Sequence, residues 1–123
     1  MKKILGAIAA LAMTVGLAAC GTPVSQGTAN QNQLVVGMEA GYPPFNWTQK
    51  DDSNGAVKIQ GTDQYAGGYD VEIAKRVAKQ LGKELVIVKT EWDGLTPALV
   101  SGKIDAIIAG MSPTEERKAT IDF

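Results

Sequence analysis

A segment near the end of the sequence, 110–117, combines helix-start residues with an arginine: Gly-Met-Ser-Pro-Thr-Glu-Glu-Arg. The spacing predicts a helix that begins here, with Ser112 as N-cap, Pro113 at the first position and Glu115 completing a capping box. A helix start offers unpaired N–H groups and a partial positive charge, and the fork of Arg117 can hold both oxygens of a carboxylate. The segment therefore predicts a site for a carboxylate or phosphate; the alternative is a structural cap beside a surface arginine.

Aromatic side chains and one carboxylate could form the rest of such a site. Segment 42–45, Tyr-Pro-Pro-Phe, places two rings on a backbone stiffened by proline, so little entropy is lost when a ligand packs on them. We expect Tyr42 and Trp92 to be ligand walls, because each lies just beyond the end of a predicted strand, and Phe45 to belong to the core. Glu39 is either the partner of a cationic ligand group or a solvated loop carboxylate.

The composition excludes several classes of function. The 123 residues include one cysteine and no histidine, so no Ser-His-Asp or Cys-His catalytic group, histidine-bearing zinc site or internal disulfide can form. The 12 basic and 13 acidic residues leave the chain near neutrality, which argues against a nucleic-acid partner. The sequence therefore predicts neither a metal nor another cofactor.

Hydrophobic runs predict the strands that position these residues. Runs 34–38, 85–88 and 104–109 are short and apolar, which is typical of strands covered on both faces. Because helical segments alternate with them, we predict an α/β fold built on a parallel sheet of strand order 2-1-3. In that order the connections after the first and third strands diverge and open a crevice bordered by residues 39–45 and 110–117.

Two helices are predicted between these strands. The first is expected to have Asp70 as its N-cap and to stop at Gly82, which can adopt the left-handed conformation. Its apolar positions recur at helical spacing and define one face: Val71, Ala74, Val77, Ala78 and Leu81. The second helix is expected over 93–101.

A long polar stretch, 46–68, separates the first strand from the first helix. The pair Asn54 and Gly55 near its middle predicts a tight turn. This turn favours a hairpin between 45–48 and 56–59.

The N-terminal region differs in kind from the rest. Two lysines precede an uncharged, mostly apolar run, 4–19, which is too short to span a membrane comfortably and is typical of a secretion signal. The run ends in Leu-Ala-Ala followed by Cys20; this resembles a bacterial lipobox, in which the cysteine receives a lipid and becomes the new N-terminus. The alternative is an ordinary signal peptide with an incidental cysteine. We expect 1–19 to be a lipoprotein signal peptide and 20–33 a flexible, lipid-anchored tether.

Six motifs follow one another through the remainder of the chain, at 37–45, 68–74, 92–99, 102–106, 112–117 and 121–123. The first reads Gly-Met-Glu-Ala-Gly-Tyr-Pro-Pro-Phe and the fifth reads Ser-Pro-Thr-Glu-Glu-Arg. Together they resemble the bacterial polar amino-acid-binding proteins of ABC importers over residues 34–123. The resemblance implies a type II periplasmic-binding-protein fold whose two lobes close on one amino acid and deliver it to permease subunits. The lipobox and tether suit a Gram-positive member, anchored by lipid on the extracytoplasmic face of the cell membrane.

The same resemblance assigns the acid and amine ends of the ligand to the segment after the third strand. It implies that Arg117 clamps the α-carboxylate, helped by the backbone N–H and hydroxyl of Ser112. It also implies that the Gly110 carbonyl accepts a hydrogen bond from the α-ammonium group.

The resemblance places the ligand side chain between Tyr42 and Trp92, with Glu39 near its tip. If Glu39 faces this pocket, charge pairing favours a cationic amino acid; if it faces solvent, a neutral polar amino acid fits as well. The sequence therefore predicts a polar or cationic amino acid as the ligand.

Residues 34–123 are interpreted as the N-terminal, truncated part of the first lobe, because the family is longer than this chain. A single lobe leaves a ligand half-solvated, so we expect weak binding from this part alone. No pair of catalytic carboxylates is evident, and we predict a binding protein and not an enzyme. Two alternatives remain: the ligand-sensing input domain of a signalling protein, and a dehydratase-like enzyme on the same fold.

Overall fold

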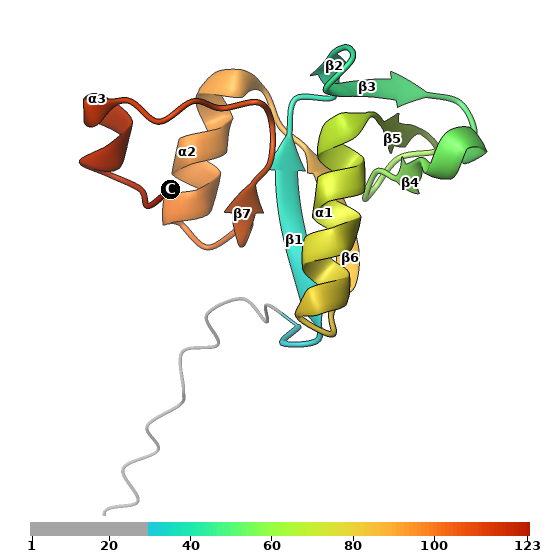
Figure 1. Ribbon diagram of the computed structural model, residues 1–123, viewed down its shortest axis with the longest axis horizontal. Helices are drawn as coiled ribbons and strands as arrows, with labels where there is room; N and C mark the ends of the chain where they lie inside the picture. Colours follow the sequence, from blue (N-terminus) through green and yellow to red (C-terminus); the bar gives the residue numbers. More distant parts are fainter. Residues whose placement is uncertain (1–29) are drawn as a thin grey trace, which may run out of the picture.

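A parallel three-stranded sheet forms the centre of the computed structural model, which describes residues 30–123. The strands lie in the order β6 (Glu84–Lys89), β1 (Gln33–Met38), β7 (Ala106–Ile107), as Figure 1 shows. Both pairings are parallel, so the predicted α/β class and the 2-1-3 strand order are confirmed. The third strand is shorter than the predicted run 104–109, since only two of its residues pair with β1.

Within residues 30–123, two helices pack against this sheet. Helix α1 (Tyr69–Gln80) packs on β6 and β1, and α2 (Trp92–Val100) packs on β1 and β7 (Figure 1). A one-turn helix, α3 (Glu115–Lys118), follows β7. Apolar side chains from both longer helices and from the strands form one buried cluster that includes Leu34, Val36, Met38, Val71, Ala74, Ala78, Ile87 and Leu95.

The start of α1 differs from the prediction. Gly68, not Asp70, is the N-cap, with φ of 121°, a conformation that an L side chain rarely adopts. A Cβ atom at Gly68 would overlap the Phe45 carbonyl, so the helix starts where the chain passes against segment 42–45. Asp70 is buried within the first turn. Of the five predicted apolar positions, Val77 and Leu81 are exposed because the face that meets the sheet is narrower than expected.

The polar stretch forms a second, antiparallel sheet of four short strands. Their order is β2 (Gly41–Tyr42), β3 (Asn46–Gln49), β5 (Tyr65–Gly67), β4 (Val57–Lys58). The predicted turn is present as a 3₁₀ turn, η1 (Ser53–Gly55), but the predicted hairpin is wrong because β3 and β4 each pair with β5 and not with each other.

A buried isoleucine explains why the hairpin does not form. Ile59 is fully buried and bridges in parallel to Ile87, and the N–H of Gln60 donates to the Ile87 carbonyl at 2.8 Å. This contact draws the segment after η1 to the outer edge of β6. The open position next to β3 is then taken by β5.

The predicted signal peptide 1–19, Cys20 and most of the predicted tether lie outside the described residues. The last tether residues, 30–33, form a turn and the first position of β1. Within residues 30–123, no helix is long and apolar enough to cross a membrane.

Candidate functional site

The helix α3, which contains Arg117, has a different N-cap residue from the one that the sequence predicts. Thr114, not Ser112, caps α3: its hydroxyl accepts the backbone N–H of Arg117 at 3.2 Å. Because proline pushes the residue before it toward an extended conformation, Ser112 stays outside the helix, which starts two residues after Pro113. The predicted capping box of Ser112 and Glu115 is therefore wrong.

This correction changes the physical basis of the predicted anion site. Helix α3 has only four residues and carries two acidic side chains, Glu115 and Glu116, in its first turn. These carboxylates oppose the binding of an anion at the helix start. A carboxylate bound here would therefore depend on the guanidinium of Arg117 and not on the start of α3.

Two contacts hold that guanidinium. Its Nη1 donates to the Ser112 carbonyl at 2.8 Å, and its Cζ lies 5.5 Å from the ring centroid of Trp92, the first residue of α2. An arginine over an indole face is attracted by the ring quadrupole, and a planar guanidinium with five N–H donors keeps several donors available after one bond. Arg117 and Trp92, 25 residues apart, therefore form one half-buried unit.

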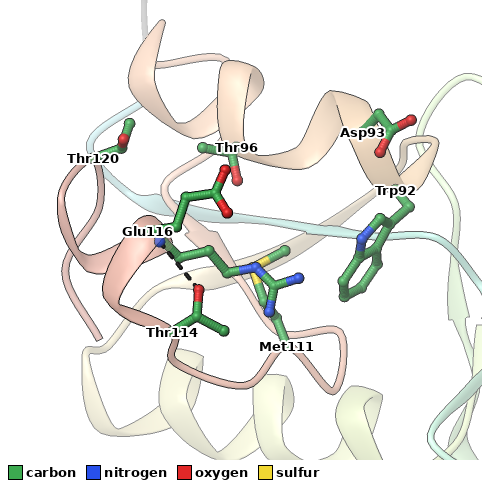
Figure 2. A pocket seen from close by; sticks show the side chains of 8 residues that line it. Trp92, Asp93, Thr96, Met111, Thr114, Glu116 and Thr120 are labelled. Carbon is green, nitrogen blue, oxygen red and sulfur yellow. Dashed lines mark hydrogen bonds between the residues drawn. The ribbon is translucent and has the colours of Figure 1, made fainter.

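A hollow of about 440 Å³ lies beside this unit. Eight side chains from α2, α3 and the segments flanking α3 line it: Trp92, Asp93, Thr96, Met111, Thr114, Glu116, Arg117 and Thr120. Figure 2 shows Trp92 and Thr96, from α2, and Glu116, from α3, around it. Three hydroxyls, two carboxylates and a guanidinium line it together with the apolar side chains of Trp92 and Met111, a mixture that suits a small ligand with charged and apolar parts.

Tyr42 lies in a second cluster of predicted residues, next to Gly110. Its ring is 52% exposed and stacks on Phe45 with centroids 5.1 Å apart. A Cβ atom built on Gly110 would lie 3.5 Å from Tyr42 Cε1, so the ring lies beside this glycine. Phe45 is itself partly exposed, and its predicted place in the core is wrong: its ring supports Tyr42 and not the sheet.

Glu39 follows β1 directly and is half-buried. Within residues 30–123 its side chain takes part in none of the hydrogen bonds, and neither of the two ion pairs includes it. The nearby Lys89, aligned with Met38 across the sheet, donates instead to the hydroxyl of Thr48 at 3.2 Å. The Glu39 carboxylate is thus not committed to a partner in the described part of the chain.

The structure also contains a polar pair that sequence reasoning missed. Asn46 and Asp70 are 0% and 4% exposed, and Asn46 Nδ2 donates to Asp70 Oδ2 at 2.8 Å. Burial raises the pKa of Asp70 above its ordinary value of 3.8, and the hydrogen bond from Asn46 opposes this in part. The sequence pattern does not distinguish Asn46 from other polar residues, and it predicts Asp70 as a helix N-cap and not as a buried partner.

Metal coordination finds no support in residues 30–123, where no group of three or more cysteine, aspartate or glutamate side chains is placed to hold an ion.

Comparison with known sequences places these residues in a family. A sequence model described as bacterial extracellular solute-binding proteins, family 3, matches residues 34–123. The arginine-binding extracellular protein ArtP of Bacillus subtilis is 34% identical over 123 residues, which is all of this chain and 43% of ArtP. A probable histidine-binding protein of Campylobacter jejuni is 36% identical over 128 residues, covering 100% of this chain and 45% of that protein. The chain thus spans less than half the length of these relatives.

A solved structure gives the same result in three dimensions. The arginine-bound form of domain 1 from TmArgBP superposes with a TM-score of 0.57 at 43% sequence identity, covering 72% of this chain and 61% of that one. Each of these three proteins is named for binding an amino acid and not for catalysis.

Proposed function

The chain belongs to the bacterial extracellular solute-binding proteins of family 3, and on that premise we propose that it binds a free polar or cationic amino acid for an ABC importer. The observation that carries the proposal is the guanidinium of Arg117, held against Trp92 and the Ser112 carbonyl beside a polar hollow. A fixed guanidinium binds a carboxylate through two parallel hydrogen bonds with little loss of side-chain entropy.

The acid and amine groups of the ligand would be held by neighbouring groups of one segment. Arg117 and the N–H and hydroxyl of Ser112 would bind the α-carboxylate. The carbonyl of Gly110, two residues before Ser112, would accept a hydrogen bond from the α-ammonium group. Every free amino acid carries this pair of charges, so these contacts give affinity without selecting a side chain.

Selection among amino acids would come from the rings and from Glu39. Tyr42 and Trp92 would enclose the ligand side chain, and Glu39 would pair with a positive charge at its tip. Two observations support a cationic ligand: Glu39 has no recorded partner within residues 30–123, and the relatives described above are named for arginine and histidine.

The location and the partners of the protein are part of the same proposal. Cys20 would carry a lipid that holds the protein on the outer face of the cell membrane, and the bound amino acid would pass to permease subunits. The support is the lipobox-like sequence before Cys20 and the family to which the chain belongs.

A screen of the chain from residue 20 onward against the twenty amino acids tests the proposal. L-Arginine, L-lysine and L-histidine should each cause saturable changes in NMR chemical shifts of the protein or saturable heats of binding in calorimetry. D-Arginine serves as the matched control. A chain that is folded by circular dichroism and binds none of the twenty at millimolar concentration would contradict the proposed function.

A further inference from the structure

The antiparallel pair of strands that includes Tyr42, β2 and β3, is joined to the start of α1 by backbone hydrogen bonds. Tyr42 on β2 is paired directly with Asn46 on β3 in the antiparallel register. The N–H groups of Tyr69 and Asp70 donate to the carbonyls of Pro44 and Phe45, at 3.2 and 2.8 Å. Figure 1 shows β3 passing near the first turn of α1.

Contacts between aromatic rings add to these backbone hydrogen bonds. The Phe45 ring stacks on Tyr42 and meets the Tyr69 ring edge-on, with centroids 6.4 Å apart. The three aromatic residues are all partly exposed, so packing among the rings alone does not fix the ring of Tyr42. Something more rigid beneath them must do so.

The buried bond between Asn46 and Asp70 is the group that can do this. It is the only side-chain hydrogen bond between β3 and α1 within residues 30–123, and Asn46 Oδ1 has no partner there. A buried amide with a hydrogen bond at only one of its two polar atoms costs free energy relative to an apolar side chain. A buried carboxylate also costs free energy. A pair that merely filled the core would be better replaced by two apolar residues.

We infer that Asn46 and Asp70 are positioning residues that hold Tyr42 as a ligand wall. The bond fixes β3 to α1, β3 fixes β2 through the Tyr42–Asn46 register pair, and the ring of Tyr42 is thereby held beside Gly110. The expected effect on ligand affinity rests on the proposed function. The expected effect on the position of the Tyr42 ring does not.

Fluorine NMR on the chain from residue 20 onward tests the ring position without a ligand. The protein contains three tyrosines, so 3-fluorotyrosine gives three signals, and Tyr42→Phe identifies the one from Tyr42. Asp70→Ala should move the Tyr42 signal toward that of free fluorotyrosine, and Asp70→Asn, which can still accept the Asn46 bond, should leave it in place. Glu72→Ala is the matched control, because Glu72 lies in the same turn and pairs with Lys75 at the surface.

Arginine titration supplies the second measurement. Asp70→Ala should weaken L-arginine binding roughly three- to tenfold, the value of one well-placed aromatic contact, whereas Asp70→Asn should bind like the parent protein. In a Tyr42→Ala background, Asp70→Ala should cause no further loss. A merely structural role would lower the melting temperature and leave both the affinity and the Tyr42 signal unchanged.

The outcomes separate the two proposals. If Asp70→Ala does not fold, Asn46→Ala/Asp70→Ala replaces it, because removing both partners leaves no lone buried polar group. A folded variant with an unmoved Tyr42 signal overturns the inference. A parent protein that binds no amino acid overturns the proposed function, while the Tyr42 signal still decides the inference.

Discussion

At the scale of single residues, the proposed charge recognition depends on Arg117 and not on the start of α3, the short helix that contains it. Its guanidinium has two fixed contacts, whereas α3 is one turn long and begins with two acidic residues. The neighbouring cation, Lys118, is instead paired with Glu115 at 3.0 Å on the surface. Two adjacent positive charges thus have different expected roles.

Arg117→Ala should reduce binding of every amino acid by roughly 100-fold, because a carboxylate then loses its only fixed cation. Arg117→Lys should recover part of that loss, since an ammonium keeps the charge but not the two-bond fork. Isothermal titration with L-arginine and with L-glutamine measures both. Lys118→Ala is the control and should bind like the parent; an equal loss in that variant would show that net charge, not the clamp, matters.

In the proposed function, Glu39 sets the preference for the ligand side chain. Glu39→Gln keeps the shape of the side chain and removes its charge. The affinity for cationic amino acids should therefore fall roughly tenfold, and the affinity for neutral amino acids should not change. The ratio of L-arginine to L-glutamine affinity is the quantity to measure. A uniform loss for both ligands would mean that Glu39 supports the loop and does not contact the side chain.

At the scale of elements, the start of α1 carries a buried carboxylate whose charge is costly. Burial raises the pKa of Asp70, so the folded protein holds a proton that the unfolded chain releases at lower pH. Stability falls with rising pH wherever the folded state binds more protons. The stabilising effect of the protonated form is complete below the ordinary pKa near 3.8 and is lost as pH rises through the raised value.

Asp70→Asn removes this titration and should keep the bond from Asn46. The difference in melting temperature, variant minus parent, should therefore increase as pH rises from about 3.8 through the raised pKa and then level off. Thermal unfolding followed by circular dichroism at a series of pH values measures it. Parallel curves for the two proteins would contradict a raised pKa at Asp70.

The elements also show which parts of the fold the sequence alone could predict. The strand order followed from three apolar runs alternating with helical spacing, because burial on both faces leaves a strong signal. The order of the small antiparallel sheet could not be predicted, because β5 has only three residues, two of them alanine and glycine with little strand propensity, and its place was decided by Ile59 at the edge of β6. The helix starts were missed for two reasons: Gly68 acts through a contact with the distant Phe45 carbonyl, and the local cap by Thr114 competed with an equally plausible one by Ser112.

The candidate site was predicted only in part, for the same physical reason. Motif positions identified Arg117, Trp92 and Tyr42, but the stacking of the guanidinium on the indole joins residues from two helices. Asn46 gave no signal, since one asparagine in a polar stretch is ordinary until tertiary structure buries it. Long-range contacts, not local propensity, made these residues into a site.

At the scale of the whole molecule, the residues of the proposed site lie on an open surface of the described part of the chain. The hollow beside Arg117 and the ring of Tyr42 lie at the surface of residues 30–123, so a ligand there would keep part of its hydration. Water then competes with every polar contact, and the net gain from each is small. Against this, domain 1 from TmArgBP, which is 43% identical to the matched part, has been crystallised in an arginine-bound form.

These two considerations give opposite expectations for the chain from Cys20 to Phe123 by itself. We predict that it binds L-arginine with a Kd of about 1 mM, equivalent to about −4 kcal/mol, since a guanidinium–carboxylate pair and one ring contact act without enclosure. Titration followed by NMR measures an affinity of this size, and Arg117→Ala is the control that should abolish it. A micromolar Kd would contradict the prediction and would mean that one preorganised wall, with Arg117 already seated on Trp92, supplies most of the recognition without a second lobe.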